Sequence, residues 1–151
     1  MVKILFICHG NICRSPMAEF VMKDIVDKAG LSHEFEIASA ATSTYEIGNP
    51  VYPPARQKLA EHGIDCKGKT ARQITKRDYD YYDYIIAMDK SNIRNLKNML
   101  SNDPQGKISL LMDYTSRPAD VADPWYTGDF QATWDDVSEG CKALLKFIMK
   151  K

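Results

Sequence analysis

The chain has 151 residues, of which 44% are apolar and 26% are charged, and its 20 Lys and Arg balance 20 Asp and Glu. These values fit one globular domain over residues 1–151, and they exclude disordered and fibrous proteins. A formal charge of zero argues against functions that depend on bulk attraction to nucleic acid or to an anionic membrane. The longest strongly apolar run, Ile4 to Cys8, is too short for a signal-peptide core or a membrane span, so we expect a cytoplasmic protein.

The first half of the chain alternates patterns typical of buried strands and of helices. Residues 2–8 are nearly all apolar and β-prone, which predicts a strand buried on both faces of a parallel sheet. A serine-proline pair opens helical spacing over residues 15–30, and a glycine ends it. Residues 35–41 predict a second strand, and a loop rich in turn-forming residues leads to a helix over residues 55–62.

The second half of the chain continues this alternation. Residues 84–88 predict a third strand, and a helix that opens at residues 89–91 and ends near residue 100 follows it. A fourth strand is predicted over residues 107–112. A long loop over residues 113–128 precedes a final helix whose apolar stripe runs from Trp134 to Ile148. Strands that alternate with helices imply right-handed crossovers, and therefore an α/β fold with a parallel sheet covered on both sides.

The most informative segment is CHGNICRSP, residues 8–16, between the first strand and the first helix. Open α/β sheets bind ligands at the carboxyl ends of their strands, and the N–H groups of a loop that enters a helix favour an anion. Gly10 permits close approach of the backbone to a ligand, and Asn11 tolerates the left-handed conformation and can brace the loop. The segment therefore predicts an anion-binding loop.

Cys8 and Arg14 give this loop its chemistry. Arg14 offers a planar fork of donors that matches two phosphate oxygens, which a lysine could not do. Cys8 stands among inward N–H groups, a helix N-terminus and a guanidinium, which together favour its thiolate. Ser15 is placed to donate a hydrogen bond to this sulfur. An ionised sulfur below a bound phosphate is a nucleophile aimed at phosphorus.

Other interpretations of this segment fit less well. It lacks the second glycine and the lysine of a GxxxxGK[ST] nucleotide-binding loop. Cys8, His9 and Cys13 lack the CxxC spacing and the second cysteine pair of a zinc site, so we expect no metal. The other two cysteines, Cys66 and Cys141, are interpreted as core or incidental thiols, because four cysteines do not make a disulfide framework.

Transfer of a phosphoryl group from a phenol or an alcohol also requires a proton for the leaving oxygen. Asp123, in the loop after the fourth strand, is expected at the same carboxyl edge as Cys8, and Pro124 favours an extended backbone there. A carboxyl group that faces a thiolate and a phosphate holds its proton more tightly, which suits a general acid. Taken alone, an Asp-Pro pair is more often a turn, as Asp103-Pro104 illustrates.

The segment FICHGNICRSPMAE, residues 6–19, resembles the signature of the low-molecular-weight protein tyrosine phosphatases. Residues 123–126, DPWY, are similar to the general-acid loop of that family, and residues 39–40, 71–74 and 83–89 are similar to further family segments in the same order. The likeness therefore spans nearly the whole chain. It implies a three-layer α/β/α fold with a four-stranded parallel sheet in the order 2-1-3-4, a phosphocysteine intermediate, no cofactor and no metal.

Carried over by position, the roles of the family fall on these segments. Cys8 would be the nucleophile, Arg14 would bind the phosphate and the transition state, and Asp123 would protonate the leaving tyrosyl oxygen and then activate water. Ser39 would be a partner of Asn11 behind the loop. The remaining loop residues that would surround the phosphate are His9, Gly10, Asn11, Ile12, Cys13 and Ser15.

Some positions carry a further implied role or depart from the family pattern. Cys13 would trap an oxidised Cys8 as a disulfide and so protect it from irreversible oxidation. Lys69 stands near a position where some members carry a histidine linked to the loop, and a protonated lysine cannot accept a hydrogen bond there. His9 replaces an apolar residue of many members and is expected to line the rim, with tuning of Cys8 as the alternative. The expected aromatic wall of a deep slot for phenyl phosphate is Tyr45, Trp125 and Tyr126.

Tyrosines and aspartates alternate just before the third strand. The pattern predicts an amphipathic edge that leads into that strand, and the alternative is a phosphorylation or partner surface. The residues are Tyr79, Tyr81, Tyr82 and Tyr84, with Asp78, Asp80 and Asp83 between them.

The predicted function is hydrolysis of phosphotyrosine, with two alternatives of the same fold. An arsenate reductase needs further cysteines to relay a disulfide outward, and residues 67–140 contain none. A protein-arginine phosphatase tends to carry threonine where this chain has Ile12, and a branched apolar residue suits an aromatic leaving group. A binding module without turnover would be expected to lack Cys8 or Asp123. We expect a monomer whose partners are phosphotyrosine proteins or peptides, and not nucleic acid or membrane.

Overall fold

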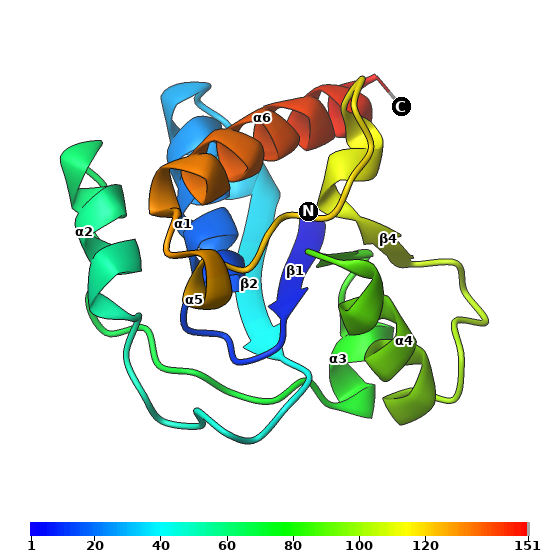
Figure 1. The fold of residues 1–151 in the computed structure, drawn as a ribbon. Helices are drawn as coiled ribbons and strands as arrows, with labels where there is room; N and C mark the ends of the chain where they lie inside the picture. The colour runs from blue at the N-terminus through cyan, green and yellow to red at the C-terminus, as the bar shows by residue number, and fades with distance from the viewer. Residues whose placement is uncertain (151) are drawn as a thin grey trace.

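The computed structural model describes residues 1–150 as a parallel sheet with helices on both faces (Figure 1). The strands are β1 (Val2–Cys8), β2 (Phe35–Ala41), β3 (Tyr84–Ala87) and β4 (Ile108–Leu110). The helices are α1 (Arg14–Lys28), α2 (Pro53–Glu61), α3 (Lys76–Tyr81), α4 (Lys90–Met99), α5 (Pro124–Thr127) and α6 (Phe130–Met149), with short 3₁₀ helices η1 (Ser32–Glu34) and η2 (Leu111–Tyr114).

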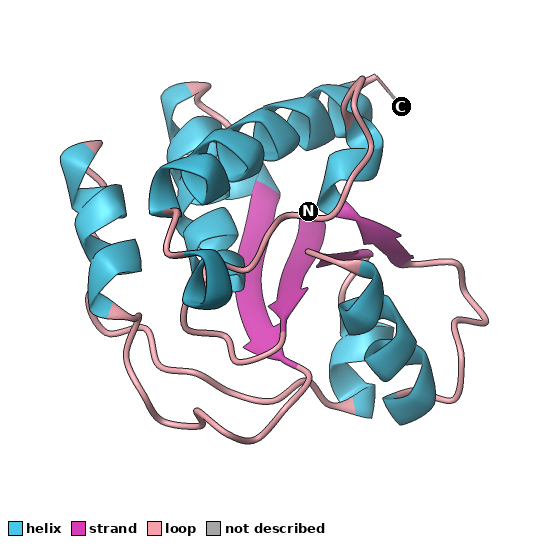
Figure 2. Ribbon diagram, viewed as in Figure 1, coloured by secondary structure: helices cyan, strands magenta, loops and turns pink. Residues whose placement is uncertain are grey.

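The four strands are all parallel and lie in the order β2-β1-β3-β4, which confirms the predicted fold (Figure 2). In the register, Phe6 of β1 pairs with Ser39 of β2 on one side and with Ile86 of β3 on the other. The carboxyl end of β1 therefore lies between those of β2 and β3. The loops that follow these strands meet at this edge, where open α/β sheets bind ligands.

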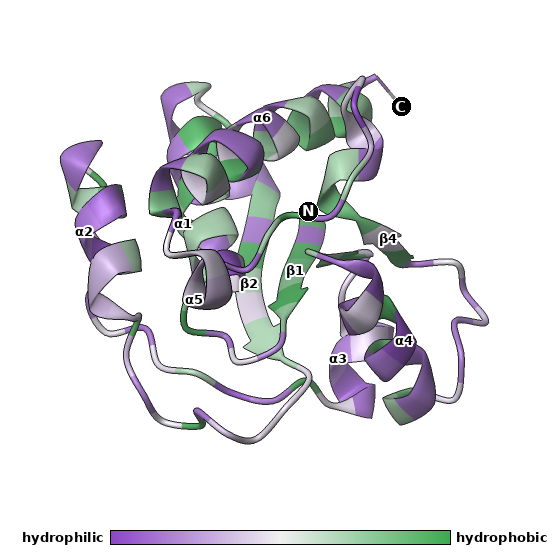
Figure 3. Ribbon diagram, viewed as in Figure 1, coloured by the Kyte–Doolittle hydropathy of each residue, from purple (hydrophilic) through white to green (hydrophobic). Residues whose placement is uncertain are grey.

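Both faces of the sheet are buried, which explains the nearly continuous apolar run in β1. Ile4 and Phe6 pack into one core with residues of α1 and α6, whereas Leu5 and Ile7 pack into a second core with residues of α3 and α4. The order of layers is thus α1, α2 and α6 on one face and α3 and α4 on the other (Figure 1). Figure 3 colours much of β1 green, the hydrophobic end of its scale, whereas α2 is mostly purple and white.

The tyrosine-rich segment begins in helix α3 and leads into β3 at Tyr84, so the predicted amphipathic edge before the third strand is mostly helical. Thr75 and Asp78 form a reciprocal capping box, in which each side chain binds the backbone N–H of the other, and this box starts the helix. Tyr79 is buried and its hydroxyl donates to Asp103 at 2.6 Å, whereas Tyr81 remains exposed. The helix therefore forms because its first turn is capped by these side chains, a signal that the alternation of tyrosine and aspartate does not contain.

Smaller differences lie around the site. Helix α1 begins at Arg14, one residue before the predicted start, so the guanidinium belongs to the first turn. β4 ends at Leu110 and continues as η2, which still buries Leu111 and Met112. The predicted long loop contains α5, because the Asp123 side chain caps a helical turn that Pro124 can open.

Residues 1–150 contain neither a helix that could span a membrane nor a cluster of side chains suited to a metal ion. None of the helices there combines the length and the apolar composition needed to cross a bilayer. Within the same residues, no group of three or more His, Cys, Asp or Glu side chains is placed to hold a metal ion.

Candidate active site

The loop between β1 and α1 closes on itself at the carboxyl edge of the sheet. Cys8 ends β1 and Arg14 begins α1, and Asn11 between them adopts a positive φ of 60°. Backbone N–H groups of Thr42 and Ser43 donate to the carbonyl groups of the first two loop residues at 3.0 and 3.1 Å. The loop is therefore fixed to the segment that follows β2, a contact that the sequence did not predict.

The sulfur of Cys8 lies among hydrogen-bond donors. The backbone N–H of Asn11 donates to Sγ at 3.3 Å, and the hydroxyl of Ser15 lies 3.0 Å from Sγ. Asn11 Nδ2 donates to Ser15 Oγ at 2.8 Å, so the hydroxyl proton of Ser15 is directed elsewhere and is available to the sulfur. This arrangement favours a negatively charged sulfur, because the N–H group donates to it and the hydroxyl is free to do so.

Arg14 is buried, with 2% of its surface exposed, and its contacts fix the guanidinium. Nη1 donates to Asp89 Oδ2 and to the carbonyl of Val121, both at 2.8 Å, and Nη2 lies 3.4 Å from Asp123 Oδ2. Burial alone would lower the pKa of Arg14, but the charge of Cys8 and the hydrogen bond that Arg14 donates to Asp89 raise it above its ordinary value. The side chain therefore stays a cation beside the loop.

Asp123 reaches the same place from the opposite side of the site. Its Oδ1 accepts the backbone N–H of Trp125 at 3.0 Å as the N-cap of α5, which leaves Oδ2 toward Arg14. The ring of Trp125 packs against Tyr52 with centroids 4.9 Å apart, and this contact holds α5 beside the segment that precedes α2. The predicted general acid and the predicted phosphate ligand thus lie together, 109 positions apart in the chain.

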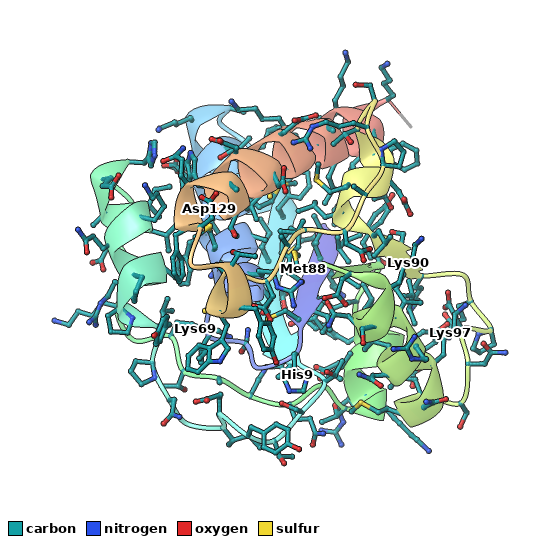
Figure 4. The ribbon with its side chains drawn as sticks, in the orientation of Figure 1. His9, Lys69, Met88, Lys90, Lys97 and Asp129 are labelled. Carbon is teal, nitrogen blue, oxygen red and sulfur yellow. The ribbon has the colours of Figure 1, made fainter. Side chains whose placement is uncertain are left out.

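A cavity of about 220 Å³ opens between the loop and α5. Figure 4 labels His9 beyond the carboxyl end of β1, and this ring lies 5.5 Å from the ring of Tyr45, so His9 belongs to the rim, as predicted. Tyr45, Trp125 and Tyr126 are exposed and form an open wall. The lining residues are Cys8, His9, Gly10, Ile12, Cys13, Arg14, Tyr45, Glu46, Asp123, Trp125 and Tyr126, of which Glu46 was not predicted.

The sequence of the chain matches one protein family over almost its whole length. The family model described as "Low molecular weight phosphotyrosine protein phosphatase" matches residues 3–151. The chain belongs to this family. It is accordingly a protein-tyrosine phosphatase, which is a phosphoric monoester hydrolase.

Individual relatives agree over almost their full length. The low molecular weight protein-tyrosine-phosphatase YfkJ of Bacillus subtilis is 42% identical, covering 100% of this chain and 98% of YfkJ. The crystal structure of YfkJ superimposes with a TM-score of 0.96 over 99% of this chain and 96% of that one. The low molecular weight protein tyrosine phosphatase SP-PTP of Streptococcus pyogenes is 44% identical and superimposes with a TM-score of 0.89, covering 99% of this chain and 94% of that one.

The same fold also occurs in a phosphatase with another named activity. The structure of DARP, a Drosophila arginine phosphatase, is 34% identical and superimposes with a TM-score of 0.89, covering 97% of this chain and 98% of that one. The fold by itself therefore does not separate phosphotyrosine from phosphoarginine as a substrate.

A hydrogen-bond chain extends from the loop of this phosphatase into its interior. Asn11 Nδ2 donates to Ser39 Oγ at 2.9 Å, and Ser39 Oγ donates to Glu19 Oε1 at 2.5 Å. Asn11 Oδ1 accepts the backbone N–H of Arg72 at 3.3 Å. Ser39 is therefore the partner of Asn11 that the sequence comparison implied, and each polar group of the Asn11 side chain has a partner.

The second cysteine of the loop, Cys13, lies in a different environment from Cys8. It caps α1 without a side-chain hydrogen bond and is 5% exposed. Burial, followed by the negative charges of Cys8 and Asp123, raises the pKa of Cys13 to about 12. The surroundings of Cys13 therefore favour a neutral thiol, unlike the donor-rich surroundings of the Cys8 sulfur.

Besides Glu46, sequence reasoning assigned no role to two acidic residues that bind the loop from outside the cavity. Asp89 was interpreted only as the start of a helix, yet besides capping α4 it binds Arg14. Its place directly after β3, at the edge that also holds Cys8, was the available signal. Glu19 lies on α1 four residues after Ser15 and is buried, and a carboxylate within an otherwise apolar helix face was the signal for it.

Proposed function

We propose that Cys8, Arg14 and Asp123 carry out the hydrolysis of phosphotyrosine through a phosphocysteine intermediate. The observation that carries the proposal is the environment of the Cys8 sulfur. The backbone N–H of Asn11 donates a hydrogen bond to this sulfur, and the hydroxyl of Ser15 lies within hydrogen-bond distance of it. A buried guanidinium, Arg14, starts the helix at the end of the same loop. Donors and a fixed cation around a thiolate suit a nucleophile that must approach a dianion.

In the first step, the Cys8 thiolate attacks phosphorus and the bond between phosphorus and the tyrosyl oxygen breaks. Asp123 gives its proton to this oxygen, so the product leaves as a neutral phenol. Asp89 and Val121 hold Nη1 of Arg14, which leaves Nε and Nη2 for two phosphate oxygens. Nη2 exchanges its 3.4 Å contact with Asp123 for the phosphate, which allows that carboxyl group to carry its proton.

In the second step, Asp123 acts as a base. Its carboxylate removes a proton from water, the water oxygen attacks phosphorus, and the bond between sulfur and phosphorus breaks. Inorganic phosphate leaves and the Cys8 thiolate is restored. The N–H groups of the loop and Arg14 stabilise the equatorial oxygens in both transition states, because the phosphoryl group keeps its charge throughout.

Phosphotyrosine is favoured over phosphoarginine and phosphoserine by the shape of the cavity. Ile12 lines its inner part, and the exposed rings of Tyr45 and Trp125 line its mouth. A branched apolar side chain and aromatic rings contact a phenyl group well. Phosphoserine offers no ring for these side chains to contact, so we expect it to bind less well than phosphotyrosine.

The partners of the enzyme are accordingly phosphotyrosine proteins or peptides. The balanced charge of the chain supports neither nucleic acid nor an anionic membrane as a partner, and we propose that the enzyme works as a monomer in the cytoplasm. It requires no metal and no cofactor, because the thiolate, guanidinium and carboxyl group supply the nucleophile, the positive charge and the proton.

Release of phosphate from a phosphotyrosine peptide and from a matched phosphoarginine peptide tests this proposal. Cys8→Ser is expected to lower kcat by at least about 10³-fold, because a serine hydroxyl in this loop is not ionised at neutral pH. Cys66→Ser is the control, because Cys66 is buried like Cys8 but does not line the cavity. Turnover by Cys8→Ser near the wild-type rate would contradict the mechanism, and equal rates on the two peptides would contradict the selectivity.

A further inference from the structure

A buried cluster of charges lies behind the phosphate loop, among residues that do not line the cavity. Glu19 of α1 is only 4% exposed, and three groups bind its carboxylate. Ser39 donates to Oε1 at 2.5 Å, Lys69 Nζ lies 3.6 Å from the same oxygen, and Lys23 Nζ donates to Oε2 at 2.6 Å. The two lysines differ in burial, since the Lys69 side chain is 12% exposed and that of Lys23 is 44% exposed.

The direction of each hydrogen bond in the cluster depends on the charge of Glu19. Both Asn11 donors are used, one on Ser15 Oγ and one on Ser39 Oγ. Ser39 accepts from Asn11 with a lone pair while its own proton points to Glu19, and a carboxylate at Glu19 accepts that proton more strongly than a neutral carboxyl group would. An ionised Glu19 therefore fixes the hydroxyl of Ser39, then the amide of Asn11, and finally the hydroxyl of Ser15 that faces the Cys8 sulfur.

The positive charge of Lys69 stabilises the buried carboxylate of Glu19. A carboxylate removed from water without a nearby cation would take up a proton. Lys23 is half in solvent, where its charge is screened, so Lys69 is the partner that faces Glu19 within the protein. Lys69 also donates to the carbonyl of Ser39 at 2.8 Å, which holds the end of β2 beside the loop.

Holding a lysine in this place has a cost. Burial lowers the pKa of Lys69 below its ordinary value of 10.5, although Glu19 acts in the opposite direction. The neighbouring cations, Arg72 of the same connection and Lys23 of α1, lower it further. A lysine that served folding alone would not be favoured at such a position.

We propose that Lys69 is a positioning residue of the phosphate loop, which acts through Glu19 and Ser39 on the Asn11 side chain and so on the hydrogen bonds to Cys8. Figure 4 labels Lys69 on the connection between α2 and α3, outside the cavity. Measurement of kcat in the test below rests on the proposed function. Measurement of Cys8 alkylation requires no turnover.

Lys69→Met keeps the length and burial of the side chain and removes its charge. It is expected to lower kcat for an aryl phosphate by about tenfold, equivalent to roughly 1.4 kcal/mol in the activation barrier, and to change KM less. The rate at which iodoacetate alkylates Cys8, measured by mass spectrometry with and without inorganic phosphate, is expected to fall in parallel. Lys69→Arg is expected to recover most of both losses, because the guanidinium keeps the charge.

Lys23→Met is the matched control, because it removes the other cation on the same carboxylate, and its rates are expected to stay within about twofold of wild type. Glu19→Gln is expected to match Lys69→Met, and the double variant is expected to lose no more than either single one. Equal effects of Lys69→Met and Lys23→Met, additive losses in the double variant, or failure of Lys69→Arg to recover activity would each overturn the proposal. If the alkylation rates of Lys69→Met, Lys69→Arg and Lys23→Met differ as expected but wild type releases no phosphate, the proposed function fails and the positioning role stands.

Discussion

Two cysteines of one loop differ in the chemistry that their surroundings permit. Cys8 receives a backbone N–H group and a hydroxyl, whereas Cys13 has no side-chain cap contact and burial raises its pKa to about 12. A thiolate is oxidised more readily than a thiol, so peroxide is expected to attack Cys8 first. Cys13 is then the neighbouring thiol with which a sulfenic acid on Cys8 can condense.

Replacement of Cys13 tests this redox prediction. In wild type, activity lost to hydrogen peroxide is expected to return with dithiothreitol, because a disulfide is reducible and protects Cys8 from further oxidation. In Cys13→Ser, most of the lost activity is expected to stay lost, since the sulfenic acid proceeds to sulfinic acid. Recovered activity after dithiothreitol is the measurement, with Cys66→Ser as control, and full recovery in Cys13→Ser would refute the role.

The carboxyl group of Asp123 gives a second prediction. Asp123→Asn keeps an oxygen that can cap α5 but has no acidic proton to transfer to the leaving oxygen, so its effect depends on the leaving group. On phenyl phosphate, kcat is expected to fall by about 10²- to 10⁴-fold, and on p-nitrophenyl phosphate by clearly less, because nitrophenolate leaves without a proton. The slope of log kcat against the pKa of the leaving phenol is the measurement, and an unchanged slope would exclude Asp123 as the acid.

Helix α6 covers the sheet at a close approach to η2. Gly140 lies on its buried side, and a Cβ atom built there would lie 2.5 Å from Leu111 Cγ and 2.9 Å from Leu111 Cδ2. Leu111 is fully buried, so its side chain cannot move into solvent. A residue with low helix propensity inside a long helix therefore has a packing reason, since no side chain fits between the two elements.

Gly140→Ala is expected to destabilise the protein despite the better helix propensity of alanine. The propensity gain is about 1 kcal/mol, whereas overpacking against a side chain that cannot move costs about 1–3 kcal/mol, so the net change in unfolding free energy is unfavourable. Urea denaturation measures the change, with Lys142→Ala on the exposed side as control. On a Leu111→Ala background, Gly140→Ala is expected to become stabilising, and the same loss on both backgrounds would show that the contact is not the cause.

Ion pairs and capping contacts between distant segments make the stability of the whole protein depend on pH. Burial would raise the pKa of Asp103, but hydrogen bonds from Tyr79 and from the backbone of Lys107 and Ile108 lower it below its ordinary value of 3.8. Asp78 has a lowered pKa as well, because the Arg72 guanidinium and Thr75 outweigh its burial. These contacts join α3 to the segments before β4 and before α3.

Acid titration of stability follows from the sign of these shifts. As pH falls below about 3.8, the unfolded chain binds protons at these two carboxylates before the folded protein does, so the unfolding free energy decreases. The Asp103→Asn variant is expected to be less stable than wild type at neutral pH. Its unfolding free energy is also expected to decrease less steeply as the pH is lowered from 5. Urea midpoints across this range measure it, and a decrease as steep as that of wild type would contradict the assignment.

The sequence by itself determined the fold class and the core of the site. β1 is apolar on both faces because both faces are covered, and the helix and strand periods that follow leave only a parallel α/β arrangement. Cys8, Asn11, Arg14 and Ser15 are neighbours in the chain, so the loop could be interpreted from its own residues. The place of Asp123 near Cys8 could also be predicted, because the loops that follow parallel strands lie at the same edge of the sheet.

Only the tertiary structure decided which distant groups meet. The pairing of Arg14 with Asp89, the burial of Glu19 beside Lys69 and the close approach of Gly140 to Leu111 depend on distances between elements that no local pattern contains. The helical state of the tyrosine-rich segment depended on a capping box that overrides the apparent alternation. The local periodicity of a segment indicates which of its residues face the core and which face water. The orientation of a buried polar side chain depends instead on hydrogen-bond partners from distant parts of the chain.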